Sequence, residues 1–136
     1  MTRILAVDFG EKRIGLATSD ASGTLATPRI TLRRRSDAVV LEELARFCGD
    51  EEIALSVFGI PRSPEGVESP IAARIRSFAA KFGERTGLPV RFHEETLTSN
   101  EAARRLNRRA RPEDLDRTAA AVLLEDYLAS VRPEAR

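Results

Sequence analysis

Acidic residues end two predicted strands of this 136-residue sequence, where a carboxylate is costly unless something pairs with it or binds to it. Asp8 follows Ile4–Val7, a short apolar run typical of a strand buried on both faces. Glu94 and Glu95 end another strand-like run. Because neighbouring residues of a strand point to opposite faces, spacing alone does not choose between these two glutamates.

A third acid, Asp116, falls on the inward side of a predicted helix. It precedes Ala120 by four residues and Leu123 by seven, so helical spacing puts it on the apolar stripe. Clustered carboxylates repel one another unless a cation lies between them, and oxygen ligands favour Mg²⁺ or Mn²⁺. Two such ions can stabilise both the attacking and the leaving oxygens of a phosphodiester displacement.

Each acid taken alone also has a simpler interpretation. Taken alone, Asp116 is better explained as a helix-start carboxylate that complements the helix dipole, because acids are common in first turns. Asp8 is explained as a turn-forming aspartate before Gly10, and Glu95 as an exposed strand end. The choice therefore depends on whether the elements that hold these residues bring them together.

Those elements follow from apolar periodicity and from turn and cap residues. Strands are predicted at Ile4–Val7, Ile14–Ala17, Thr24–Leu32, Ala54–Ile60 and Val90–Glu95. Helices are predicted from the caps Ser36–Asp37 to Gly49–Asp50, from Ser69–Pro70 to Gly87, from Thr98 to Leu106, and from Pro112 with a stripe through Val131.

Three strands followed by alternating helices and strands predict an α/β fold with a five-stranded mixed sheet and helices on both faces, as one domain over residues 1–136. Pro28 indicates that the third strand lies at an edge. If strands one, four and five are parallel neighbours, Asp8 and Glu95 share one rim of the sheet, where ligands bind in such folds.

Composition narrows the class of protein. The net charge is only +1, but arginines gather at Arg33–Arg35 and again between Arg104 and Arg111, so one face can still bind a polyanion. The single cysteine, Cys48, falls on an apolar stripe and is expected to be inert core. No apolar run approaches the length of a membrane span and no signal-peptide pattern is present, so a cytoplasmic protein is expected.

Smaller signals stay open or favour a structural role. Lys12 and Arg13, in the predicted hairpin turn, are equally suited to contacting phosphates and to solvating the turn. His93 is the only histidine and has no partner set typical of a base or a metal ligand. Tyr127 lies on the apolar stripe of the last helix, which favours core packing over base stacking.

Four segments in order make the chain similar to a known family. They are DFGEKRIGLATSD from Asp8, GIPRSPEGVESPIA from Gly59, EETLTSNEA from Glu94 and DRTAAAVLLEDYL from Asp116. The chain resembles the YqgF/RuvX family of Holliday junction resolvases and pre-16S rRNA nucleases, which implies a ribonuclease H-like fold. Thr96 departs from the family pattern, which has an arginine at that position.

The resemblance implies a metal-dependent nuclease. It makes Asp8, Glu95 and Asp116 the catalytic acids and the ligands of Mg²⁺ or Mn²⁺, and so selects Glu95 over Glu94. Precursor 16S ribosomal RNA and branched DNA remain alternative substrates. The rival class is a non-catalytic module that binds nucleic acid or assists ribosome assembly. The protein is expected to be a monomer or homodimer, with no membrane partner. The basic residues expected to position nucleic acid are Lys12, Arg13, Arg62, Arg104, Arg105, Arg108 and Arg109.

Overall fold

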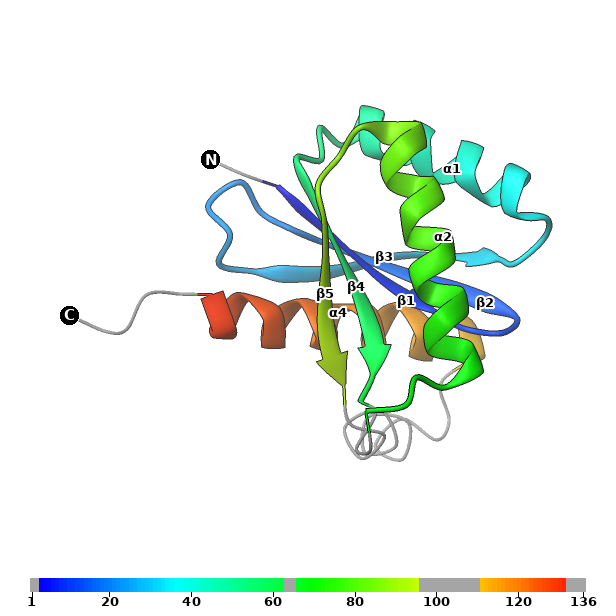
Figure 1. The fold of residues 1–136 in the computed structure, drawn as a ribbon. Coiled ribbons are helices and arrows are strands. Elements are labelled where there is room, and N and C mark those ends of the chain that lie inside the picture. Colours follow the sequence, from blue (N-terminus) through cyan, green and yellow to red (C-terminus); the bar gives the residue numbers. More distant parts are fainter. Residues whose placement is uncertain (1–2, 63–65, 96–110, 132–136) are drawn as a thin grey trace.

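The computed structural model describes residues 3–62, 66–95 and 111–131, which form a five-stranded sheet and three helices (Figure 1). In chain order the elements are β1 Ile4–Phe9, β2 Arg13–Ser19, β3 Ala26–Arg33, α1 Asp37–Asp50, β4 Leu55–Pro61, α2 Pro70–Thr86, β5 Val90–Glu95 and α4 Pro112–Val131. The helix expected from Thr98 to Leu106 lies outside the described residues, as do Arg104, Arg105, Arg108 and Arg109.

The sheet has the mixed topology expected from the sequence. Its strand order is β3-β2-β1-β4-β5. β1 pairs antiparallel with β2 and β2 with β3, whereas β1 with β4 and β4 with β5 are parallel. The predicted meander and the edge position of the strand with Pro28 are therefore confirmed, and the carboxyl ends of β1, β4 and β5 meet at one rim.

Helices α1 and α2 cover one face of the sheet with large side chains. Alternate residues of β1, beginning with Leu5, enter this core together with Phe58 of β4. The rings of Phe58 and Phe82 meet edge to face with centroids 5.5 Å apart. Cys48 of α1 is buried here, and burial raises the pKa of its thiol to about 12, which confirms its expected core position.

The opposite face of the sheet carries fewer large side chains. The other alternate residues of β1, Ile4 and Ala6, lie on this face with Ala17 of β2 and Val57 of β4. Helix α4 covers it, packing mainly against β1, β2 and β3, and Figure 1 shows this helix on the side of the sheet away from α2. Small residues on the sheet allow α4 to approach closely, and this approach decides where Asp116 lies.

The helix ends follow the sequence closely. The Ser36 and Ser69 hydroxyls accept hydrogen bonds from the third residue beyond each, and Gly87 ends α2 in the left-handed conformation that favours glycine.

One expectation was wrong: Val131 was placed on the inward stripe of α4 but is 55% exposed, because the helix there extends past the sheet. Among the described residues, no helix has both the length and the apolar character needed to cross a lipid bilayer.

Candidate active site

The register of β1 puts Asp8 on the α4 face of the sheet. Leu5 and Val7 enter the core under α1 and α2, whereas Ile4 and Ala6 enter the core under α4. Since side chains alternate along a strand, Asp8 continues the Ile4–Ala6 series and faces α4. It is half-buried, near the end of β1 and directly opposite Gly15 in β2.

Glu95 reaches the same face from β5. A Cβ added to Gly59 of β4 would overlap its carboxylate and lie 3.1 Å from a methyl carbon of Leu123 in α4. Gly59 is level with Asp8, because Val7 and Phe58 are paired and these two residues follow them. The Glu95 carboxylate therefore occupies the space above Gly59, one strand spacing of about 4.8 Å from the strand of Asp8.

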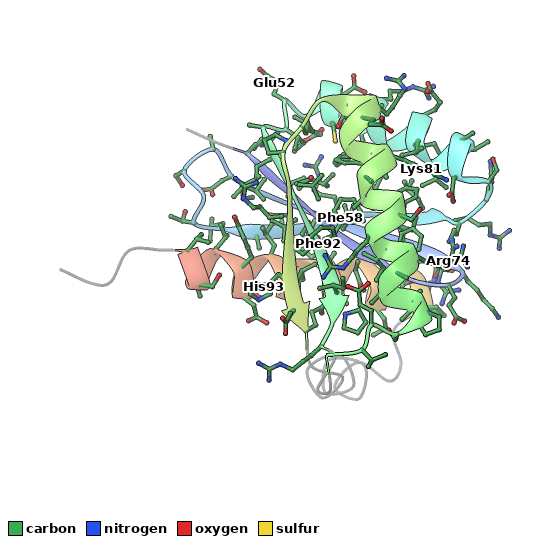
Figure 2. The ribbon with its side chains drawn as sticks, in the orientation of Figure 1. Glu52, Phe58, Arg74, Lys81, Phe92 and His93 are labelled. Carbon is green, nitrogen blue, oxygen red and sulfur yellow. The ribbon has the colours of Figure 1, made fainter. Side chains whose placement is uncertain are left out.

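Glu94 points the other way. Its carboxylate accepts a weak hydrogen bond from Arg62 at 3.4 Å, and it lines a cavity with Glu68 and Arg76 on the α2 side of the sheet. The same alternation separates Phe92, which contacts Phe58, from His93, whose ring meets Tyr127 of α4 edge to face at 6.1 Å (Figure 2). The strand pattern left the choice between Glu94 and Glu95 open. In the structure, Glu95 is the one that lies on the α4 face of the sheet, as Asp8 does.

Asp116 is held over the sheet by the first turns of α4. It is only 6% exposed, so the predicted inward position is confirmed. A Cβ on Gly15 would overlap the main-chain carbonyl of Asp116 and lie 2.9 Å from the backbone nitrogen of Arg117. The helix thus rests directly on the backbone of β2 at the residue opposite Asp8, and this contact brings Asp8 and Asp116 to the same place.

Arg13 supplies a positive charge to this buried acid. Its Nε donates a hydrogen bond of 2.6 Å to an Asp116 carboxylate oxygen, and the Arg13 side chain keeps about a third of its surface exposed. An ion pair this close to the core compensates a charge that would otherwise be costly to bury. Arg13 was expected to contact nucleic acid, which stays a prediction; in the structure it pairs with Asp116.

The three acids offer the chemistry that a divalent cation requires. All three offer carboxylate oxygens on one face of the sheet, from β1, β5 and α4. Within the described part of the chain, however, no three acidic, histidine or cysteine side chains are gathered as closely as the ligands of a bound ion. The Asp116 carboxylate instead contacts the guanidinium of Arg13, which compensates its charge.

The remaining predicted contacts are divided between exposed positions and undescribed ones. Lys12 is exposed at the β1–β2 turn, beside Asp8 at the same rim. Arg62 is exposed next to β5, where its backbone nitrogen donates to the Glu95 carbonyl at 3.1 Å. The four arginines between Arg104 and Arg109 lie outside the described residues, so their role stays a prediction.

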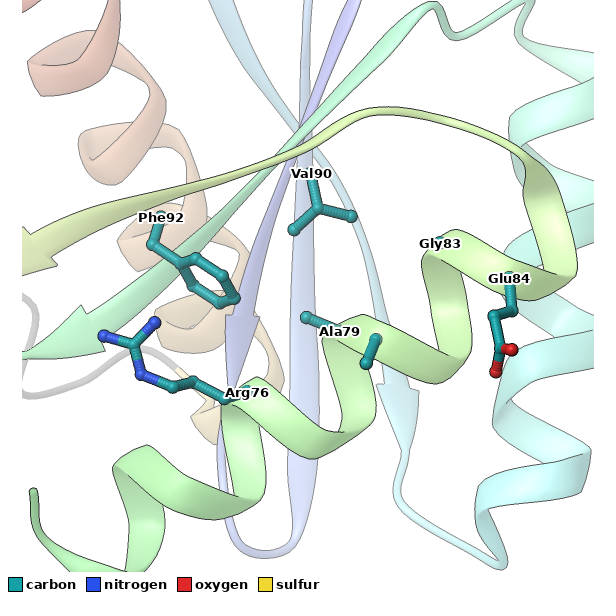
Figure 3. Close-up of a pocket in the computed structure, with 7 residues that line it drawn as sticks. Arg76, Ala79, Gly83, Glu84, Val90 and Phe92 are labelled. Carbon is teal, nitrogen blue, oxygen red and sulfur yellow. The ribbon is translucent and has the colours of Figure 1, made fainter.

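An apolar cavity of about 240 Å³ lies apart from these acids. It is between α2 and β5, and Figure 3 shows the Arg76 guanidinium over the ring of Phe92, 4.8 Å from its centroid. Val90 and Phe92 line this cavity from β5, so it is on the face of the sheet opposite to Glu95. The cavity is not part of the acidic site.

Sequence reasoning missed the two glycines that make room for the site. Gly15 admits the backbone of α4, and Gly59 admits the carboxylate of Glu95. Each interrupts an apolar strand, and a glycine inside a strand is a known sign that another group approaches the backbone closely. That signal was present in the sequence, although it does not say which group approaches.

The geometry defines the class of protein as an α/β fold whose mixed sheet has carboxylates from β1, β5 and α4 at one rim. Solved structures of the same fold support this class. The RuvC protein of Thermus thermophilus in complex with a Holliday junction superposes with a TM-score of 0.58, at 11% identity, over 96% of this chain and 95% of that one. The fowlpox virus Holliday junction resolvase also gives 0.58, at 16% identity, over 96% of this chain and all of the other. The predicted ribonuclease H-like fold is confirmed.

The family is shown by sequence. The model of the RuvX family, described as Holliday junction resolvase, matches residues 2–130. A protein of Moorella thermoacetica named "Putative pre-16S rRNA nuclease" is 40% identical over 134 residues, covering 93% of this chain and 94% of its own length. A protein of the same name from Anaplasma marginale is 37% identical over 131 residues, covering 93% and 83%. The chain belongs to the RuvX family, as its motifs indicated.

Replacing Gly15 by alanine tests the contact that places Asp116. The added methyl group would overlap the main chain of α4, which cannot turn aside as a flexible side chain can. We expect Gly15→Ala to lower the free energy of unfolding by about 1–3 kcal/mol or more, the usual cost of overpacking a close contact. Urea titrations followed by circular dichroism measure this change.

Gly49→Ala is the matched control for that experiment. Gly49 lies in α1 with open space at its Cβ position, so alanine should stabilise the protein by about 0.5–1 kcal/mol. Equal stability of the Gly15→Ala variant and the wild type would show that α4 does not rest on β2 as described.

Proposed function

We propose that this protein is a metal-dependent nuclease that hydrolyses phosphodiester bonds, with Asp8, Glu95 and Asp116 as its catalytic acids. The observation that carries the proposal is their convergence from three separate elements on one face of the sheet, with Gly15 and Gly59 making room for it. A helix-start or turn role for each acid would not require this shared location. Membership of the RuvX family supports the same assignment.

The three carboxylates are also the groups that would hold Mg²⁺ or Mn²⁺, as two ions. When bound, the metal would supply charge stabilisation for the displacement at phosphorus. The chain itself fixes the positions of the acids: the end of β1 holds Asp8, Gly59 leaves space for Glu95, and the first turns of α4 hold Asp116. Lys12 and Arg62, exposed at the same rim, would bind backbone phosphates on either side.

Precursor 16S ribosomal RNA, cut near its 5′ end, is the substrate we favour. The curated relatives that match over more than 90% of this chain have names that refer to that RNA. A Holliday junction is the second candidate, supported by the description of the family model. In either role we propose a single domain over residues 1–136 that works in the cytoplasm as a monomer or homodimer.

Substitution of the acids tests the nuclease proposal. Asp8→Asn, Glu95→Gln and Asp116→Asn keep the shape of each side chain but remove the charge that holds a cation. Each should reduce Mn²⁺-dependent cleavage of precursor RNA and of junction DNA by more than about 100-fold, beyond the usual cost of losing a supporting residue. Mn²⁺ should raise the melting temperature of the wild type and raise that of each variant much less.

Glu94→Gln provides the internal control. Glu94 is the next residue in β5 but lies on the other face, where its contact with Arg62 is exposed and of little energetic consequence. This variant should cleave and bind Mn²⁺ as the wild type does. Loss of cleavage in Glu94→Gln with full activity in Glu95→Gln would overturn the assignment of the catalytic glutamate.

Gly59→Ala should separate catalysis from stability. Its methyl group would occupy the space of the Glu95 carboxylate, which can rotate away because it is the end of a flexible side chain. Overpacking against Leu123 should cost no more than about 1–3 kcal/mol, whereas cleavage should fall as far as in Glu95→Gln. Thermal melts and single-turnover cleavage measure the two effects.

Gly83→Ala serves as the comparison because its nearest neighbour outside the local helix backbone would be 3.5 Å from the new methyl group, an ordinary contact. We expect wild-type cleavage and unchanged or slightly higher stability from it. Wild-type cleavage by Gly59→Ala would mean that the observed position of Glu95 is not needed for the reaction.

A further inference from the structure

A second group of charges lies at the same rim, on the other side of β1 from Glu95. The segments 10–13 and 33–35 contain five basic residues and one acid, Glu11, although the whole chain has a net charge of only +1. We call this group the basic corner; its members are Lys12, Arg13, Arg33, Arg34 and Arg35.

Strand pairing makes the basic corner one surface. Arg13 at the start of β2 is the direct cross-strand neighbour of Arg33 at the end of β3. The backbone nitrogen of Arg34 donates to the carbonyl of Lys12 at 2.9 Å, which joins the β1–β2 turn to the segment that leaves β3. Residues some twenty positions apart in the sequence are therefore adjacent, next to the turn that follows Asp8.

Arg34 holds this corner together from the inside. It is half-buried, and its Nη1 donates to the carbonyls of Gly10 at 3.2 Å and Glu11 at 3.1 Å. Its guanidinium also lies over the ring of Phe9, 4.6 Å from the centroid. Since Nη1 is bonded to two carbonyls of the turn and the flat face lies on Phe9, Arg34 is a positioning residue that fixes the turn beside Asp8.

The other basic side chains have their charges turned outward. Lys12, Arg33 and Arg35 are exposed, and none of them forms an ion pair with another residue in the part of the chain that the structure describes. Arg13 is compensated by Asp116, but its neighbour Arg33 is not. Arg33 therefore presents an outward charge next to the Arg13–Asp116 pair, which suits the binding of a polyanion.

Arg33 lies on the same face of the sheet as the three acids. Thr31, two residues earlier in β3, donates its hydroxyl to the carbonyl of Glu113 in α4 at 2.5 Å, so Thr31 and Arg33 face the α4 side. β2 lies between β3 and β1, so the axes of β3 and β1 are two strand spacings apart, about 10 Å. A polymer with a phosphate at Asp8 can therefore reach Arg33 with a neighbouring phosphate.

We propose that the basic corner binds the backbone phosphates of a nucleic-acid strand as it leaves the acids toward β3. The inference rests on the proposed function for the location of the reacting phosphate, but not for the binding itself. Arginine forks pair with phosphate oxygens through two parallel hydrogen bonds and do not distinguish bases. The corner thus adds affinity without sequence preference, and RNA and DNA share the chemistry that it recognises.

The test measures binding without cleavage. Fluorescence anisotropy in EDTA, over a series of salt concentrations, gives the affinity for single-stranded RNA, single-stranded DNA and a four-way DNA junction. In the double variant Arg33→Gln, Arg35→Gln the slope of log affinity against log salt should fall by about 0.7–0.9 for each phosphate that the variant no longer binds. An unchanged slope on all three nucleic acids would overturn the proposal.

The matched control removes the same charge elsewhere. Arg46 lies in the second half of α1, and Arg91 lies at the start of β5, at the end of that strand opposite to Glu95; both are exposed and lie away from the rim. Their double glutamine variant should keep the wild-type slope. A decrease equal to that of the Arg33 and Arg35 variant would show that overall charge, and not the basic corner, governs binding.

Two further measurements separate the possible failures. Arg34→Gln should weaken binding and also lower the melting temperature, whereas the Arg33 and Arg35 variant should weaken binding alone; the reverse pattern would overturn the division of roles.

If the wild type binds with the expected slope but does not cleave with Mn²⁺, the nuclease proposal fails and the basic corner stands. If it cleaves while the slope is unaffected by the variant, the basic corner fails and the nuclease proposal stands.

Discussion

The close approach of α4 to β2 at Gly15 is the constraint on which the acidic site depends. Without a side chain on Gly15, the main chain of Asp116 rests on the strand directly beside Asp8. The small residues Ala6 and Ala17 around it keep the helix close along its length. A larger residue at Gly15 would lift the start of the helix and separate two acids that are distant in the sequence, so packing at this contact is a condition for the chemistry.

The Arg13–Asp116 ion pair compensates the buried charge of Asp116 in the protein without metal. Removing one partner from a buried ion pair typically costs about 3–5 kcal/mol, because the other charge is left uncompensated. Arg13 avoids that cost for Asp116, and its side chain still reaches the surface. If the three acids held a divalent cation, Asp116 would no longer need Arg13 as its partner, and Arg13 would be available to the nucleic acid proposed to bind at Arg33. The acidic site and the basic corner are thus linked through one arginine.

The sequence predicted the elements well because apolar periodicity is local information. Ser69 and Gly87 mark the ends of α2, and the inward spacing of Asp116 already indicated its burial. The choice between Glu94 and Glu95 needed either the family resemblance or the register of β5. Neighbouring residues of a strand point to opposite faces, and two adjacent glutamates do not indicate which of them faces the site. Val131 was misplaced because helical spacing does not tell where the sheet beneath a helix ends. Contacts between distant segments were beyond the sequence: Arg13 and Asp116 lie 103 residues apart, and nothing local to either indicates that they pair.

A crystal structure of the protein grown with Mn²⁺, with anomalous scattering recorded at the manganese edge, tests the central claim most directly. We expect anomalous density on the α4 face, with oxygen ligands from Asp8, Glu95 and Asp116, and with the Arg13 guanidinium withdrawn from Asp116. Density at carboxylates elsewhere, or an intact contact between Arg13 and Asp116 with no density between the three acids at saturating Mn²⁺, would contradict the claim.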